Sequence, residues 1–184
     1  MNLLDKLFGR LGNRMFQMAF LYSYAKECGI DYYFQDPSYF EQYEGEIKYL
    51  FGKNIPPKLD MVAIHVRRGD YVGNNFYTNL METPYYVDAM SLFPDASFMV
   101  FSDNIDWCKQ QEIFKDCEFS EGLSEEQDLN LMASCVGHII ANSSFSWWGA
   151  WLSPYSTKIV APSVDKWYSD GVERTKCPQK WIRL

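Results

Sequence analysis

The chain has 184 residues, which fits about one domain, and 47% of them are hydrophobic, as expected for a protein with its own core. Its formal net charge of −7 argues against a nucleic-acid partner, because the molecule as a whole would repel a polyanion. No apolar run is long enough to span a bilayer, and Asp5 and Lys6 interrupt the segment where a signal peptide would be apolar. We therefore expect a soluble protein.

Cysteine usage limits the chemistry further. The five cysteines are odd in number and widely spaced, without a C-x-x-C pair, and only two histidines could complete a metal site. The sequence supports neither a zinc site nor a disulfide framework. A reducing compartment fits best, so the expected location is cytoplasmic.

The first predicted element is a helix. Gly9–Gln17 is a glycine-punctuated turn that runs into a broad apolar helical face, and Gly29 gives that helix a stop. Tyr32–Phe51 is aromatic and acidic without a clean period, and a short helix from Pro37 is expected there. Ile55–Pro57 then punctuates the chain.

From residue 61 onward, predicted strands and helices alternate. The predicted strands are Met61–Val66, Ser97–Phe101, Cys117–Phe119, Val136–Ala141 and Lys158–Ala161. The predicted helices are Tyr85–Phe93 with Pro84 at its first turn, Asn104–Phe114 capped by Ser102 or Asp103, Glu125–Cys135 opened by a Ser124–Gln127 capping box, and Ser146–Leu152. This alternation predicts an α/β fold with a Rossmann-like, doubly wound parallel sheet.

The segment Met61–Tyr71 is the most informative one. An apolar strand is followed at once by Arg67, Arg68, Gly69 and Asp70, which places two guanidiniums where open α/β sheets bind ligands. Burying both would cost several kcal/mol per ion unless a negative group meets them. The segment therefore predicts an anionic ligand, with a structural ion pair between Asp70 and one arginine as the alternative.

Further polar segments follow or border other strands, so they should converge on the same end of the sheet. Ser102–Asn104 is either a helix cap or a group that grips ribose hydroxyls or the edge of a guanine. Asn142–Ser146 offers hydroxyls and backbone N–H groups at a helix start, as an anion site or again as a cap. The Trp147-Trp148 pair is core or lid, and Asp128 is a solvated or first-turn acid.

Three motifs together resemble the α-1,2-fucosyltransferase family, glycosyltransferase family 11. They are His65-Val66-Arg67-Arg68-Gly69-Asp70, the segment Gly9–Gln17, and the segment Asn142–Leu152. The resemblance implies inverting, metal-independent transfer of fucose from GDP-fucose to a sugar hydroxyl, with no cofactor. It also implies a GT-B-like fold whose C-terminal Rossmann-like half holds the donor.

The resemblance also implies roles for single residues. Arg67 and Arg68 match the family's arginine pair, whose first member binds the diphosphate and helps the leaving group depart. Asp70 is a candidate general base, or it orients an arginine. The implied donor-binding residues are His65, Asp103 at guanine or ribose, Ser143, Ser144 and Ser146 at the phosphates, and Gly9, Gly12 and Asn13 from the first motif.

The chain departs from the family near its N-terminus. A substantial domain should separate the first motif from the aromatic segment Tyr33–Phe40, but Gly29–Asp31 runs into that segment almost directly. We expect residues 1–54 to hold the motif helix and a remnant of the acceptor-side domain, and residues 55–184 to form the GDP-sugar-binding domain. Expected partners are GDP-fucose, a glycan acceptor and, if Trp147-Trp148 leaves an open apolar surface, a second copy of the chain. The alternatives are a non-catalytic GDP-sugar-binding relic and a small partner-binding module.

Overall fold

The protein is described from a computed structural model, which describes residues 9–27 and 40–184. A six-stranded sheet in the order β3-β2-β1-β4-β5-β6 forms its centre, and all neighbouring strands are parallel. The strands are β1 (Leu59–Val66), β2 (Phe98–Ser102), β3 (Glu118–Phe119), β4 (Cys135–Ile139), β5 (Lys158–Ala161) and β6 (Ile182–Arg183). The predicted α/β fold with a doubly wound parallel sheet is confirmed.

The strand order reverses next to β1. Val62 of β1 pairs with Phe98 of β2 on one side and with Gly137 of β4 on the other. The chain therefore winds outward in both directions from the β1–β4 pair. In sheets of this kind, ligands bind outside the carboxyl ends of the strands at this point of reversal.

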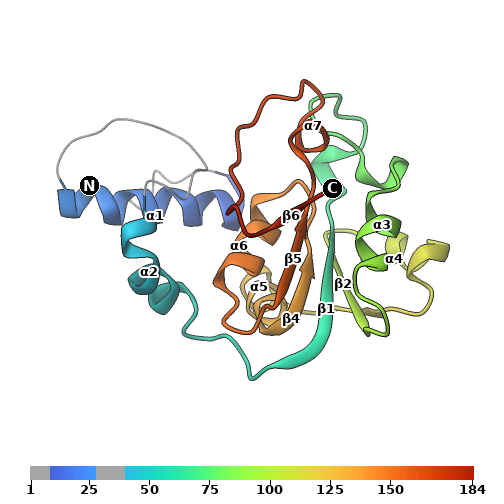
Figure 1. The fold of residues 1–184 in the computed structure, drawn as a ribbon, viewed down its shortest axis with the longest axis horizontal. Coiled ribbons are helices and arrows are strands. Elements are labelled where there is room, and N and C mark those ends of the chain that lie inside the picture. The colour runs from blue at the N-terminus through green and yellow to red at the C-terminus, as the bar shows by residue number, and fades with distance from the viewer. Residues whose placement is uncertain (1–8, 28–39) are drawn as a thin grey trace.

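Helices cover both faces of the sheet (Figure 1). On one face lie α3 (Tyr85–Ser91) and α4 (Ile105–Cys108), and on the other lie α1 (Leu11–Glu27), α5 (Glu125–Ser134) and α6 (Ser144–Leu152). The remaining helices are α2 (Glu44–Phe51) and α7 (Val164–Trp167), with 3-10 turns at Glu41–Tyr43, Gly69–Tyr71, Leu80–Glu82 and Glu112–Phe114. Both faces of β1 are buried: Val62 and Ile64 join one core and Ala63 joins the other.

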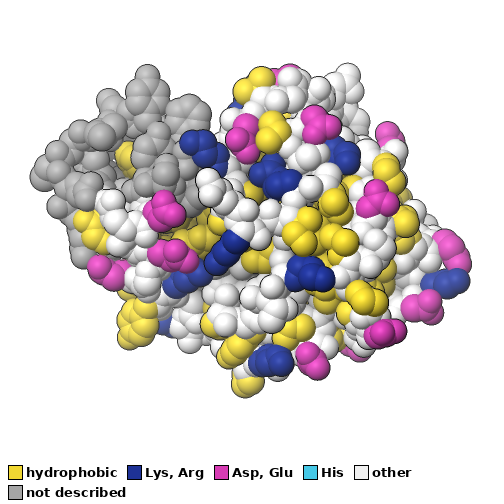
Figure 2. Space-filling model, in the orientation of Figure 1, with side chains coloured by type: hydrophobic (Ala, Val, Ile, Leu, Met, Phe, Trp, Pro, Cys, Tyr) yellow, Lys and Arg dark blue, Asp and Glu magenta, His cyan; other side chains and the backbone are white. Residues whose placement is uncertain are grey.

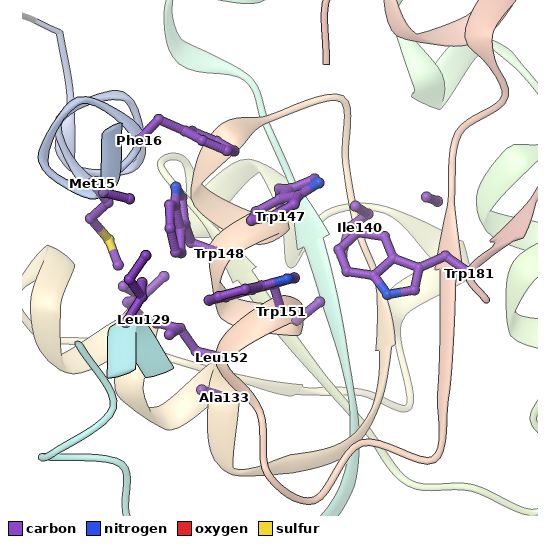
Figure 3. Close-up of a cluster of buried hydrophobic side chains, with 14 of the residues drawn as sticks. Met15, Phe16, Leu129, Ala133, Ile140, Trp147, Trp148, Trp151, Leu152 and Trp181 are labelled. Carbon is purple, nitrogen blue, oxygen red and sulfur yellow. The ribbon is translucent and has the colours of Figure 1, made fainter. Parts of the chain in front are cut away.

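A cluster of aromatic side chains fills the space between α1 and α6. We call it the tryptophan cluster: Phe16, Phe40, Trp147, Trp148, Trp151 and Trp181 (Figure 3). Phe16 lies 4.8 Å from both Trp147 and Trp148 between ring centroids, and Phe40 stacks on Trp148 at 5.7 Å. Trp147 and Trp148 are fully buried, so of the two readings of this pair the core is correct and the lid is wrong.

The expected open Trp147-Trp148 surface is also wrong, because Phe16 of α1 and Phe40 cover it. The expectation that a second copy of the chain covers this surface therefore has no support from it. Figure 2 shows acidic, basic and hydrophobic side chains interspersed over the part of this face that is described. In the part of the chain that is described, no helix is both long and apolar enough to cross a membrane.

Most predicted helices are present, with one clear exception. The capping box of Ser124 and Gln127 opens α5 as expected. The predicted helix Asn104–Phe114 is wrong as a continuous element: it ends after one turn, and a 3-10 turn begins at residue 112. Cys108 and Phe114 are both buried, but they would lie on different sides of a continuous helix, so the break lets both side chains reach the core. Its predicted cap is wrong too: the side chain of Asn104, not of Ser102 or Asp103, accepts from Trp107 N–H.

Two expectations fall on residues that the structure does not describe. The predicted stop at Gly29 and the helix start at Pro37 lie outside the described residues. The boundary at residue 54 stays a prediction. The short elements α7 and β6 were not predicted, because four and two residues carry too little periodicity to be recognised.

Candidate functional site

A cavity of about 410 Å³ opens at the carboxyl ends of β1, β2 and β4, beside the reversal of strand order. It is lined by the loops after these strands, by the first residues of α1 and α6, and by residues near α5 and α7. The predicted residues that it brings together are Gly9, Gly12, Asn13, His65, Arg67, Asp70, Asp103, Ser143 and Ser144. Arg68 and Ser146 do not line it.

Arg67 is the most firmly held charge of the cavity. Its Nη1 lies 2.9 Å from Asp103 Oδ2, and its Nη2 pairs with Asp70 Oδ1. Its side chain is only 9% exposed, and the guanidinium carbon lies 5.3 Å from the centroid of the Tyr71 ring. The alternative of an Asp70–arginine ion pair is thus present as a contact, but this contact lies in the wall of a cavity.

Arg68 points elsewhere. Its guanidinium carbon lies 3.5 Å from the centroid of the Trp107 ring of α4, and its buried Nε has no hydrogen-bond partner. Its backbone N–H, however, donates to Asp103 Oδ1 at 2.9 Å. Adjacent arginines therefore differ in what they offer: Arg67 presents its guanidinium to the cavity, and Arg68 supports the cavity through its backbone.

Asp103 is the centre of these contacts. Its Oδ1 accepts from Arg68 N–H, and its Oδ2 lies 2.9 Å from Arg67 Nη1 and 3.4 Å from Arg10 Nη1. Gly69 makes this possible, because a Cβ at residue 69 would collide with Asp103 Oδ2. Both oxygens of Asp103 are thus engaged by basic or N–H groups.

The starts of α1 and α6 meet at the cavity. Gly12 allows this approach, since a Cβ there would lie 2.6 Å from the carbonyl carbon of Ser144. Ser144 Oγ donates to Asn13 Oδ1 at 2.7 Å, which links the two segments by their side chains. Residues of both helix starts line the cavity, and helix N-termini favour anions through free N–H groups and the helix dipole.

The serines of α6 differ in their positions. Ser143 is the N-cap residue of α6, but its side chain makes no capping hydrogen bond. The interpretation of this hydroxyl as a helix cap is therefore wrong. Ser146 is fully buried, and its hydroxyl donates to the carbonyl oxygens of Ala141 at 3.5 Å and Ser143 at 3.3 Å. Of these three serines, Ser143 and Ser144 line the cavity and Ser146 does not.

His65 is a neutral side chain in the wall. It is 4% exposed, and burial lowers its pKa to about 3. Its Nδ1 is buried and has no hydrogen-bond partner, while its ring lies 5.4 Å from that of Phe145. A neutral imidazole can accept or donate one hydrogen bond, but it does not supply a positive charge at neutral pH.

One end of the cavity is aromatic. Tyr71 stacks on Tyr77, with ring centroids 3.6 Å apart and planes 6° apart, and Tyr168 lies beside them. Tyr71 O–H donates to Asn142 O at 3.0 Å, and the Asn142 amide donates to Trp167 O at 2.9 Å. Sequence reasoning missed these tyrosines, because they lie in loops without a periodic pattern.

The other end combines apolar and acidic side chains: Phe101, Leu123, Glu125 and Asp128. Asp128 is half-buried and accepts from Ser120 Oγ at 2.5 Å, and burial raises its pKa. It lies in the first turn of α5, as its sequence position indicates, but it also lines the cavity. Among the described residues, no group of three or more His, Cys, Asp and Glu side chains could hold a metal ion.

The chain is similar to known glycosyltransferases over most of its length. The family model of glycosyl transferase family 11 matches residues 10–183. An α-1,2-colitosyltransferase of Escherichia coli is 37% identical over 178 residues, which cover 83% of this chain and 61% of the relative. The O-antigen biosynthesis glycosyltransferase WbnK of Escherichia coli is 31% identical over 152 residues, which cover 74% and 48%. The chain thus spans only about half to three fifths of these relatives.

A solved structure is more distant. The crystal structure of NodZ α-1,6-fucosyltransferase soaked with GDP-fucose aligns with a TM-score of 0.45 and 13% identity, covering 90% of this chain and 66% of that chain. A likeness at this level carries no argument about the ligand of this protein.

Proposed function

The chain belongs to glycosyl transferase family 11, and we propose that it transfers fucose from GDP-fucose to a sugar hydroxyl, forming an α-1,2 linkage with inversion. One observation carries the proposal. Two helix N-termini and the guanidinium of Arg67 meet in one cavity at the reversal of strand order. This combination suits a nucleotide diphosphate, because both kinds of group bind phosphate oxygens.

The proposed pose puts the diphosphate between Arg67 and the starts of α1 and α6. The base then points toward Phe101 and Asp128, at the apolar and acidic end of the cavity. Guanine carries N–H donors on one edge, and a carboxylate is the matching acceptor. Since both oxygens of Asp103 are already engaged, Asp128 and Glu125 are better candidates than Asp103 for reading the base.

The proposed reaction is a single displacement. The acceptor oxygen bonds to the anomeric carbon of fucose, the bond from that carbon to the phosphate oxygen breaks, and the acceptor proton passes to a base. Arg67 stabilises the charge that grows on the departing GDP. Asp70 is the proposed base, because its side chain is 63% exposed and lines the cavity beside Arg67. His65 is the poorer candidate, because it is only 4% exposed and lies in the wall of the cavity.

Colitose is the alternative sugar. It lacks one hydroxyl of fucose, and a relative that is 37% identical is described as an α-1,2-colitosyltransferase. The described residues that line the cavity are compatible with either sugar, since the features that carry the proposal concern the diphosphate.

The test supplies GDP-fucose or GDP-colitose, with and without a galactose-terminated oligosaccharide, and measures the release of GDP and the formation of product. We expect acceptor-dependent release from one of these donors and at least a hundredfold loss in Asp70→Asn if Asp70 is the base. Binding of GDP without turnover would favour the non-catalytic relic. Absence of both binding and turnover would favour the partner-binding module.

A further inference from the structure

We propose that Arg10 is a second phosphate-binding guanidinium of this cavity, and that Asp103 is a positioning residue which holds Arg10 and Arg67 side by side. This inference rests on the proposed function, because it assigns a further ligand to the diphosphate of the donor. Arg10 comes from the loop before α1 and lines the cavity together with Gly9 and Gly12.

The two guanidiniums meet at one carboxylate oxygen. Arg10 Nη1 and Arg67 Nη1 lie 3.4 Å and 2.9 Å from Asp103 Oδ2. Two positive groups this close would repel each other, and the shared carboxylate offsets that repulsion. Asp70 pairs with the other side of Arg67, so the four side chains carry no net charge as a set.

The environments of the two arginines differ in a useful way. The Arg67 side chain is 9% exposed and is held by two carboxylates, so its direction is fixed. The Arg10 side chain is 54% exposed and its contact with Asp103 is longer, so it can turn toward a ligand at small cost. A guanidinium has five N–H donors, so Arg10 can keep its contact with Asp103 and still donate to a phosphate oxygen.

The backbone around this pair is shaped for the contact. A Cβ at Gly69 would lie 3.6 Å from Arg10 Nη2 besides colliding with Asp103 Oδ2, so a side chain there would occupy the place where the three groups meet. Gly9 has a φ of +84°, which glycine adopts without strain, and this turn directs residue 10 toward the loop after β1. An exposed ion pair alone adds little stability, so stability does not account for the contact between Arg10 and Asp103, whereas binding of a phosphate would.

The experiment compares Arg10→Gln with Arg14→Gln in the full chain. Arg14 lies one helical turn further along α1, is exposed and does not line the cavity, so it is a matched control for charge. Titration calorimetry measures GDP binding, and ligand-observed NMR measures guanosine binding. We expect Arg10→Gln to weaken GDP binding about tenfold or more, with guanosine binding unchanged within twofold. Arg14→Gln should leave both ligands within twofold of the wild type.

The role of Asp103 has its own readout. If Asp103 acts through Arg10, the losses of GDP affinity in Arg10→Gln and Asp103→Asn should add to more than the loss in the double variant. Should Arg10→Gln fail to fold, Arg10→Lys should show a smaller loss of the same kind, because it keeps the charge without the planar fork.

The outcomes separate this inference from the proposed function. If the wild type does not bind GDP, the proposed function fails. If the wild type binds GDP and Arg10→Gln binds it equally well, only the role of Arg10 is overturned. If Arg10→Gln weakened the binding of GDP and of guanosine equally, the role of Arg10 would also be overturned, because a residue that contacts only the phosphates should not change the binding of a nucleoside.

Discussion

The first turn of the short helix α6 borders the cavity and the body of the same helix packs into the tryptophan cluster, and these two regions differ in almost every physical respect. In the cluster, Trp147 and Trp148 are fully buried against Phe16 and Phe40. In the cavity, Ser143 and Ser144 line the same space as the charged side chains of Arg67 and Asp103. Nine residues of α6 therefore pass from a polar site into a dry core.

The two regions of α6 serve different roles, one in stability and one in the polar site. The body of α6 is held by packing, which is insensitive to ligands, and its first turn keeps polar groups that packing does not use. Substitutions in the cluster should reduce the free energy of unfolding, and substitutions in the cavity should reduce binding. Each test below probes that division.

The largest effect should come from Trp148→Ala. The side chain is fully buried and its Nε1 has no hydrogen-bond partner, so the loss is one of packing. We expect the free energy of unfolding to fall by about 3–5 kcal/mol, measured by urea denaturation. GDP affinity of the folded fraction should stay within about twofold, and Trp148→Phe should cost less. A loss below about 1 kcal/mol would contradict the account of the cluster.

Acid should destabilise the protein, because a neutral histidine is buried in the wall of the cavity and another in strand β4. Burial lowers the pKa of His65 to about 3 and that of His138, which lies between Met132 O and Ser156 Oγ, to about 4. The unfolded chain takes up these protons near pH 6.5 and the folded chain does not, so stability is present above pH 6.5 and is lost as the pH falls below it. The expected slope is up to about 1.4 kcal/mol per pH unit for each histidine.

Urea denaturation at pH 7, 6 and 5 checks this slope. His65→Gln and His138→Gln should each make the pH dependence of the free energy of unfolding shallower than in the wild type. Equal slopes in all three proteins would mean that other groups cause the acid sensitivity.

Arg67→Ala should act on binding and not on the core. Loss of a charge-assisted contact should weaken GDP binding by roughly 1.5–3 kcal/mol, about one to two decades, while urea denaturation changes much less. Arg67→Lys should restore little, since an ammonium cannot replace the bidentate fork. Unfolding of Arg67→Ala would show that the ion pairs with Asp70 and Asp103 are mainly structural.

The smallest effect should come from Arg68→Ala, although the residue is adjacent. Its stacking on Trp107 should contribute about 0.5–1 kcal/mol to the free energy of unfolding. GDP affinity should stay within about twofold, because the backbone N–H that binds Asp103 remains. A loss of GDP affinity as large as that of Arg67→Ala would show that both guanidiniums reach the ligand.

Sequence reasoning succeeded where a physical pattern repeats. The alternation of apolar strands and capped helices predicted five of the strands and the parallel sheet, because burial on both faces requires long apolar segments such as Met61–Val66. The rule that ligands bind at the carboxyl ends of parallel strands predicts that His65, Arg67 and Ser143 lie near one another, and these residues do share the cavity.

Side-chain direction was beyond this reasoning. Arg67 and Arg68 are identical in type and adjacent, and only the position of Trp107 and the room beside Gly69 decide which guanidinium enters the cavity. The position of Asp128 in its own helix predicts an acid of the first turn, but its place in the cavity wall depends on other segments, such as Ser120 after β3, which donates to it. Tyr71, Tyr77 and Tyr168 meet through loops, where no period indicates a partner.

The contact between Gly12 and Ser144 also bears on how the chain folds. Asn13 and Ser144, which are joined by a hydrogen bond, are 131 residues apart in the sequence. A contact of such separation closes slowly, and during synthesis the first motif leaves the ribosome long before α6 exists. Met15 and Phe16, which are buried against residues of α6 in the complete fold, therefore stay uncovered until α6 has been synthesised, and unfinished chains expose this apolar surface. If the proposed nucleotide site uses both helix starts, only chains whose synthesis has passed α6 can bind the nucleotide.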